Sequence, residues 1–193
     1  GFYVPSLYNV QYNSDGTIAL FEPKYDDVPK RVVKRVVADL NTSYFPLKPV
    51  MPYIETVHDR IMLETFRGCI RGCRFCQAGF LYRPFREKST ETICAQAKAL
   101  CDNSGYDEMS LSSLSTSDHS DIVHMLDELL KYTDERRINM SLPSLRVDNF
   151  TQDVLERVTA VRKSGLTFAP EAGTQRLRDA INKNVTEEEV MRT

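Results

Sequence analysis

Short apolar strands alternate with amphipathic helices from residue 58 onward, and this alternation limits the fold more than any other feature. The predicted strands cover residues 60–66, 108–114, 138–142 and 166–170. The predicted helices that follow them cover residues 89–103, 118–132, 150–163 and 173–182. Such a series builds a parallel sheet through right-handed crossovers. We therefore predict an α/β fold, a partial (β/α) TIM-type barrel truncated to about four βα units.

The first 57 residues lack this alternation. A hairpin is predicted over residues 2–22, because Asp15-Gly16 is a turn signal between two strand-like runs. Residues 29–41 predict an amphipathic helix, whose apolar stripe contains Val32, Val33, Val36, Val37 and Leu40. A proline-punctuated connector follows at residues 42–57. We expect two domains: residues 1–57 with the hairpin, helix and connector, and residues 58–193 with the truncated barrel.

The C-terminal residues predict the start of one more helix. Thr186 and Glu189 form a capping-box pattern, and apolar residues begin at Val190. The sequence stops three residues later, so we expect the chain to be a piece of a longer protein. A truncated barrel exposes an open sheet edge, and open edges pair with other strands. We therefore expect the fragment to self-associate.

Composition narrows the setting. The chain has 193 residues, a net charge of −2 and five cysteines, of which three are clustered. No run of eighteen apolar residues and no signal-peptide pattern occurs, so we expect no membrane partner and a cytoplasmic location. An odd, clustered set of cysteines favours a reducing compartment with metal or redox use over a disulfide scaffold.

The clustered cysteines are Cys69, Cys73 and Cys76, within "RGCIRGCRFCQAGF" at residues 67–80. Their spacing also fits one face of a helix, which would make them core residues. Three glycines oppose that interpretation, since each costs about 1 kcal/mol inside a helix; they are Gly68, Gly72 and Gly79.

Two metal sites remain as alternatives. A Cys3His zinc site would need His58, His119 or His124 as its fourth ligand. It would stabilise an α/β binding module that faces RNA through a basic loop, without catalysis. The other alternative is an iron–sulfur cluster, because thiolates are the ligands that such clusters use. Three ligands would leave one iron open to a substrate or cofactor.

The pattern Cys69-x3-Cys73-x2-Cys76, with Phe75 before the last cysteine, resembles the motif of the radical S-adenosylmethionine (radical SAM) superfamily. The resemblance implies that the three cysteines bind a 4Fe-4S cluster and that SAM binds the open iron. It also implies an oxidoreductase-like iron–sulfur enzyme that cleaves SAM reductively to a 5′-deoxyadenosyl radical. Such an enzyme needs an external electron donor protein.

Longer stretches are similar to one subgroup. "PSLRVD" and "LTFAPEAGTQRLRDAINKNVTEEE" resemble bacterial radical SAM proteins of unassigned function that carry a cobalamin-binding domain before the barrel. Cobalamin would then bind a domain absent from this chain. Residues 166–189 also resemble the matching segment of methylthiotransferases. The resemblance leaves radical chemistry, methyl transfer and methylthio transfer open, with RNA or protein as the substrate.

The resemblance also implies residues that contact SAM. Phe75 would lie near the adenine, and Glu171 would accept hydrogen bonds from the amino group or ribose. Arg146 would pair with the carboxylate as a bidentate fork, with Ser144 as a further polar contact. The Gly-Gly-Glu that often holds the amino group is missing from "LSSLSTSD", where Ser112 is the candidate replacement.

Basic residues surround the cysteines. Residues 60–88 hold seven basic and two acidic residues, an excess of five on a nearly neutral chain. We expect this charge to favour an anionic cluster, a reductant protein or RNA phosphates. Asp118 beside His119 fits either a helix cap or an acid/base pair.

Overall fold

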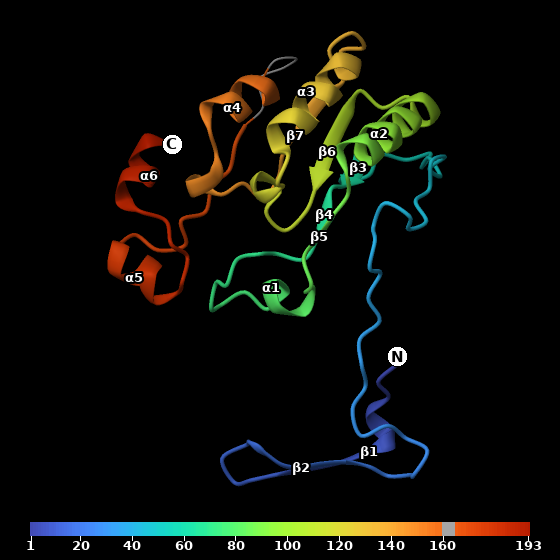
Figure 1. Ribbon diagram of the computed structural model, residues 1–193, viewed down its shortest axis with the longest axis vertical. Helices are drawn as coiled ribbons and strands as arrows, with labels where there is room; N and C mark the ends of the chain where they lie inside the picture. The colour runs from blue at the N-terminus through green and yellow to red at the C-terminus, as the bar shows by residue number, and fades with distance from the viewer. Residues whose placement is uncertain (160–164) are drawn as a thin grey trace. The chain divides into compact units, whose positions relative to one another are not determined.

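The computed structural model describes residues 1–159 and 165–193 (Figure 1). The chain consists of two compact units, Gly1–Ala38 and Asp39–Thr193. The first unit contains the 3-10 helix η1 (Pro5–Leu7) and an antiparallel hairpin of β1 (Tyr8–Tyr12) and β2 (Ile18–Pro23). At the turn of the hairpin, Gly16 adopts a φ of +81°. The predicted hairpin is confirmed.

The predicted helix over residues 29–41 is wrong, because these residues form neither helix nor strand. Three of its four stripe valines are exposed, with Val33 at 72% exposure. An isolated helix of this length is marginal in water, and β-branched valines lower helix propensity further. Burial of a continuous apolar face usually offsets these costs, and here three of the four valines stay exposed. Leu40, the last residue of the predicted stripe, is fully buried within the second unit.

A parallel three-stranded sheet forms the centre of the second unit. Its order is β3 (Ile61–Glu64), β6 (Glu108–Ser112) and β7 (Asn139–Ser141). Helix α2 (Thr90–Ser104) connects the first two strands, and α3 (Ile122–Thr133) connects the last two. The first three predicted strands and the first two predicted helices are thereby confirmed, and the unit is α/β.

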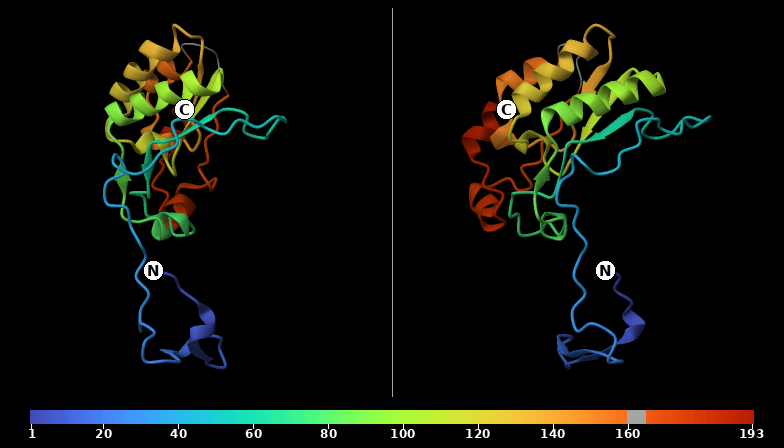
Figure 2. Two further views of the ribbon diagram at one scale, coloured as in Figure 1. Left: turned by 90° about the vertical axis from the view of Figure 1, so that its right-hand side faces the viewer. Right: turned by 45° about the vertical axis from the view of Figure 1, so that its right-hand side comes forward.

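The core lies between this sheet and its helices. Helices α2, α3 and α4 (Gln152–Val158) pack side by side (Figure 2). Ser89 caps α2 by accepting a hydrogen bond from the Thr92 amide, and Gly105 ends it with a left-handed φ of +74°. The amphipathic stripe of α3 is fully buried, and it consists of Met125, Leu126 and Leu129.

The fourth predicted unit is only partly formed. Instead of a strand over 166–170, a single parallel bridge joins Phe168 to Leu145. Pro170 follows two residues later and cannot donate to a ladder. Helices α5 (Gln175–Ala180) and α6 (Glu187–Arg192) come next, and the predicted capping box of Thr186 and Glu189 opens α6. The end of the helix predicted over residues 150–163 lies outside the described residues from residue 160 onward. Within the described ranges, every helix is too short or too polar to span a bilayer.

The fold predicts where a core substitution is costly. Leu111 lies on the central strand β6 and is fully buried, so Leu111→Ala should lower the free energy of unfolding by about 2–5 kcal/mol. Val57→Ala is the control, because Val57 is exposed in the same unit and should change stability by at most about 0.5 kcal/mol. Urea denaturation followed by circular dichroism measures both. Equal effects of the two substitutions would contradict the described core.

Candidate metal centre

The three clustered cysteines lie on one closed loop, residues 68–85, here called the cysteine loop. Two short antiparallel strands close its base, β4 (Phe66–Arg67) and β5 (Arg86–Glu87). Gly68 begins the loop with a φ of +94°, and a Cβ there would lie 2.9 Å from the carbonyl oxygens of Tyr82 and Pro84. Only glycine fits this position. The cysteine loop follows β3 in sequence, so it lies at the carboxyl end of the parallel strands.

All three cysteines are free thiols outside regular secondary structure. Helix α1 (Ala78–Leu81) begins after the last of them, so the helical core-stripe interpretation does not hold. Cys73 is buried, whereas Cys69 and Cys76 are half-buried. Gly79 leaves space beside Cys76, because a Cβ there would lie 3.8 Å from the Cys76 Sγ.

Electrostatics ties the three thiols together. Burial raises the pKa of Cys69, the Arg71 amide opposes this by donating a hydrogen bond to its Sγ at 3.4 Å, and Asp118, Cys73 and Cys76 raise it again. Nearby thiolates therefore disfavour each other's charge. Coordination of the thiolates to iron ions would offset this repulsion, because coordinating thiols are deprotonated by the positive charge of the metal.

A buried carboxylate lies behind the loop. Asp118, at the end of the 3-10 helix η2 (Thr116–Asp118), accepts two hydrogen bonds from the Arg71 guanidinium, one of them at 2.8 Å. Ser115 Oγ and Asn149 Nδ2 donate to the same carboxylate at 2.7 and 2.6 Å. Burial opposes ionisation of Asp118, but these hydrogen bonds outweigh it and hold its pKa below the ordinary value. Asp118 is therefore a charged anchor for Arg71, not a partner of His119.

A second buried pair continues this network. Asp148, in the 3-10 helix η3 (Val147–Asn149), accepts from Arg71 Nη1 at 3.0 Å and from Arg146 Nε and Nη2 at 2.8 and 2.9 Å. The remaining Arg146 nitrogen, Nη1, lies 3.9 Å from the Cys73 Sγ. Arg146 was predicted to hold the SAM carboxylate, and in the structure its guanidinium binds Asp148 and lies beside a cluster cysteine.

The other predicted SAM contacts lie around the same end of the sheet. Ser112 ends β6, and Ser144 follows β7 with a left-handed φ of +60°. Glu171 also has a positive φ, +69°, and its Oε1 accepts from Lys183 Nζ at 3.2 Å. Phe75, on the cysteine loop, is 53% exposed. Positive φ values at non-glycine residues carry a cost of about 1–3 kcal/mol, and they concentrate at functional sites.

A cavity of about 300 Å³ opens where β3 and β6 end. Its lining includes Ser112 and the glycine that begins the cysteine loop, and it consists of Glu64, Phe66, Arg67, Gly68, Tyr82, Ser112, Ser113 and Leu114. Ligands of parallel α/β folds bind at this end of the strands. The cavity therefore offers space at the base of the cysteine loop.

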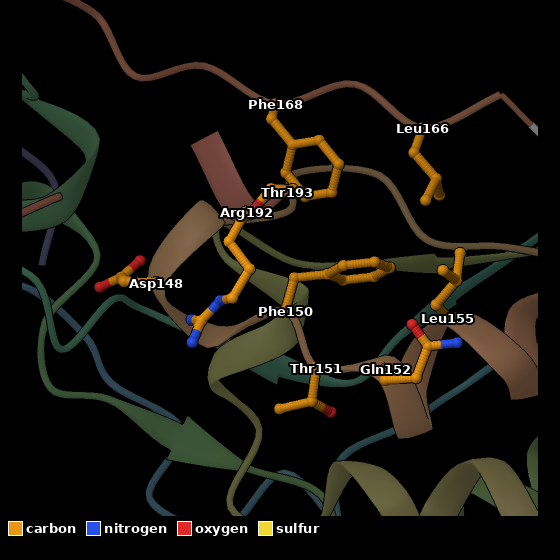
Figure 3. A pocket seen from close by; sticks show the side chains of 9 residues that line it. All are labelled: Asp148, Phe150, Thr151, Gln152, Leu155, Leu166, Phe168, Arg192 and Thr193. Carbon is orange, nitrogen blue, oxygen red and sulfur yellow. The ribbon is translucent and has the colours of Figure 1, made fainter. Parts of the chain in front are cut away.

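A second cavity of about 490 Å³ adjoins the buried network at Asp148 (Figure 3). Figure 3 shows it surrounded by Phe150 and Phe168, whose rings meet edge to face 5.1 Å apart, and by leucine side chains. Apart from its polar rim, it is apolar. It begins where the fourth predicted strand makes its single bridge, at Phe168.

The basic side chains of residues 60–88 form hydrogen bonds and ion pairs with other groups of this chain. Every one of the seven has an acceptor in this chain. Three arginines pair with carboxylates: Arg60 with Glu108, Arg67 with Glu64, and Arg71 with Asp118 and Asp148. The other four donate to neutral groups: Arg74, Arg83 and Arg86 to the carbonyls of Ala180, Arg71 and Pro84, and Lys88 to the Gln96 side chain. The local excess of positive charge thus stabilises the loop and its surroundings.

Two of the three candidate zinc histidines have other neighbours in the protein. His119 is buried, its Nε2 lies 3.2 Å from the Lys88 carbonyl, and its Nδ1 accepts from the Asp121 amide. His124 lies 3.9 Å from Glu128 on α3. Among residues 1–159 and 165–193, no three histidine, cysteine, aspartate or glutamate side chains converge on one ion. Thiolates are the ligands that iron–sulfur clusters use, so the ligand chemistry of the three cysteines fits such a cluster.

Sequence reasoning missed the carboxylates behind the loop. Asp118 was considered only as a cap or an acid, and Asp148 was not considered at all. A usable signal was present, because both follow strands in a βα series and their acidic side chains face a loop rich in arginine. Asn182, which donates to the Gly72 carbonyl at 2.8 Å, gave no signal of this kind.

The network predicts a pH-dependent contribution to stability. Asp118→Asn should lower the free energy of unfolding at pH 7 by roughly 1–3 kcal/mol, because Arg71 loses a charged acceptor. The folded pKa of Asp118 lies below its ordinary value of 3.8, so this stabilisation is present above 3.8 and is lost as the pH falls through the folded pKa. Urea titrations from pH 7 to pH 3 should show the two proteins converging at the acidic end.

Asp102→Asn is the matched control. Asp102 pairs with Arg136, but both side chains are nearly half exposed, so the substitution should have a much smaller effect at pH 7. A constant difference between Asp118→Asn and the wild type over the whole pH range would contradict the assigned role of the carboxylate.

Known proteins resemble this chain over most of its length. It matches the Radical SAM superfamily over residues 63–193. The uncharacterized protein MJ0966 of Methanocaldococcus jannaschii is 29% identical over 182 residues, covering 94% of this chain and 38% of that protein. MJ0865 of the same archaeon, provisionally named a methylthiotransferase, is 26% identical over 135 residues, covering 66% of this chain and 30% of that protein. This chain thus spans less than two-fifths of either relative. Since the family match includes the cysteine loop and more than half of the chain, the chain belongs to the radical SAM superfamily.

Proposed function

We propose that this chain is part of a radical SAM enzyme that cleaves S-adenosylmethionine reductively. The observation that carries the proposal is the cysteine loop: three free thiols with x3 and x2 spacing, at the carboxyl end of a parallel sheet, inside the segment that matches the family. When bound, a 4Fe-4S cluster supplies one electron to SAM, which then cleaves to methionine and a 5′-deoxyadenosyl radical. Cys69, Cys73 and Cys76 would hold that cluster.

The residues of the chain would hold SAM beside it. Phe75 is an exposed aromatic ring between two of the cysteines, suited to the adenine. Ser112, Ser144 and Glu171 lie at or beyond strand ends, and the strained backbone of the last two supports a binding role. Arg146 is the proposed contact for the SAM carboxylate. Its hydrogen bonds to Asp148 would fix the direction in which Nη1 points.

Further aspects of the proposal extend beyond this chain. An external electron donor protein would reduce the cluster, and the strand series would belong to a partial TIM-type barrel. The relatives are much longer than the chain, so the substrate, RNA or protein, would be bound partly by segments outside it. Cobalamin would require a separate domain.

Methyl or methylthio transfer is the second candidate reaction. It is favoured by the 26% identity to a relative provisionally named a methylthiotransferase. Product analysis separates the candidates. 5′-Deoxyadenosine forms whenever SAM is cleaved reductively, whereas S-adenosylhomocysteine forms only when SAM donates its methyl group.

The cysteine assignment predicts the metal content. Anaerobic reconstitution with iron and sulfide should give about four irons per wild-type chain. Replacing Cys69, Cys73 or Cys76 by alanine should remove most of this iron, because each substitution removes one of three ligands. Iron and sulfide analysis measures the content, and the EPR spectrum of the reduced wild type should change when SAM is added.

Cys94→Ala and Cys101→Ala are the matched controls and should keep the full iron content. Both residues lie on α2, and burial raises the pKa of the Cys101 thiol to about 11, which disfavours a thiolate ligand. Zinc uptake without iron, or full iron retention in a cysteine-loop variant, would overturn the assignment.

The adenine contact predicts a change in affinity. Phe75→Ala should weaken SAM binding to the reconstituted protein by about 2- to 10-fold, the usual loss for one aromatic stacking partner. Phe80→Ala is the control, because Phe80 lies on the same loop and is 52% exposed, compared with 53% for Phe75. Anaerobic equilibrium dialysis measures both affinities. An equal loss in the two variants would argue against a specific role of Phe75.

A further inference from the structure

The segment after α5 holds the middle of the cysteine loop, although more than one hundred residues separate the two in sequence. The Arg74 amide donates to the Ile181 carbonyl at 2.9 Å, and its guanidinium donates to the Ala180 carbonyl. From the other side, Asn182 Nδ2 donates to the Gly72 carbonyl at 2.8 Å. The two loop residues in contact, Gly72 and Arg74, flank Cys73 directly.

The contact at Asn182 is close and specific. A Cβ on Gly72 would lie 3.1 Å from Asn182 Nδ2, so a side chain at position 72 would push the amide away. Asn182 itself has a left-handed φ of +57°. Among residues with side chains, asparagine adopts this conformation most readily. It thereby offers a side-chain donor where glycine would offer none.

The next residue of the segment reaches Cys73 by a second route. The Lys183 carbonyl accepts from Arg146 Nη2 at 2.7 Å, and Arg146 Nη1 lies 3.9 Å from the Cys73 Sγ. Arg146 is buried, and Lys183 is nearly so. Cys73 is therefore bounded by backbone contacts on both sides and by a guanidinium at its sulfur.

Arg178 fixes the segment in turn. Its guanidinium is buried and donates to the carbonyls of Ala172 and Gly173 before α5 and of Val185 after it, at 2.7–3.1 Å. The two ends of α5 are thus tied together by one side chain. Because Arg178 holds both ends of α5, the residues that follow the helix, including Asn182, are held in place beside the cysteine loop.

The geometry points to Asn182 as a positioning residue for the cluster ligand Cys73. This inference rests on the proposed function only in treating Cys73 as a cluster ligand. The hydrogen bond from Asn182 is present in the protein without a cluster. Asn182 holds the Gly72 carbonyl, and through it the backbone that presents the Cys73 thiol. Losing the side chain should free this part of the loop without unfolding the unit.

The test is thiol alkylation of the metal-free chain, read residue by residue by mass spectrometry. Asn182→Gly keeps the left-handed backbone and removes only the side-chain donor. It should accelerate alkylation of Cys73 by about fivefold, the effect of losing one hydrogen bond on a local opening equilibrium. The buried Cys101 on α2 should react at the wild-type rate.

Asn184→Gly is the matched control. Asn184 is the same residue type with a similar φ of +54°. Its substitution removes only an exposed 3.3 Å hydrogen bond to Asn182 Oδ1 and keeps the donor, Asn182 Nδ2, that binds the Gly72 carbonyl. It should leave the Cys73 rate within twofold of the wild type. A wild-type Cys73 rate in Asn182→Gly would overturn the inference, and so would equal acceleration at Cys73 and Cys101, which signals general destabilisation.

A second measurement separates this inference from the proposed function. After reconstitution, Asn182→Gly should lose iron to a chelator several-fold faster than Asn184→Gly. Failure of the wild-type protein to take up iron would refute the proposed function while leaving the alkylation result intact. Faster alkylation of Cys73 with unchanged iron release would show that Asn182 holds the loop but does not position a ligand, and would also overturn the inference.

Discussion

The cysteine loop depends on an alternating chain of charges, in which Asp118 and Arg146 are buried and Arg71 and Asp148 are half-buried. Arg71 bridges Asp118 and Asp148, and Arg146 shares Asp148 before it reaches Cys73. Removing two carboxylates from water is expensive, and such groups persist in a protein interior only when their hydrogen bonds are complete. Asp118 meets this condition with four donors from three residues. This network supports the loop beside Cys69 and Cys73, in addition to the contacts from the segment after α5.

The periodicity of the sequence predicts the strands and helices next to the loop well. β3, β6 and β7 and their helices follow from short apolar runs that alternate with amphipathic stripes, because burial against a sheet imposes both patterns. The helix expected over residues 29–41 does not form, and the same requirement for burial explains why. Its stripe is present in the sequence, but three of the four valines stay exposed, and β-branched valines lower helix propensity.

The site was predictable only in part. The cysteine spacing is local and carries chemistry, so Cys69, Cys73 and Cys76 could be selected from the sequence alone. Asp148 and Asn182 could not, since their roles arise from contacts with residues about 80 to 110 positions away, which no local pattern encodes. Arg146 was selected from the sequence as a contact for the SAM carboxylate, but the sequence gave no sign that Asp148 and Cys73 would surround its guanidinium.

The reach of these contacts along the chain has a consequence for the order of folding. The hydrogen bond from Asn182 to the Gly72 carbonyl spans 110 residues, and the one from Arg146 to the Lys183 carbonyl spans 37. Contacts of such length form late, because loop-closure entropy must be overcome before they contribute. The β4–β5 pairing spans only about 20 residues, so its loop-closure cost is lower. We therefore expect the base of the cysteine loop to form before the contacts that fix Cys73 within it.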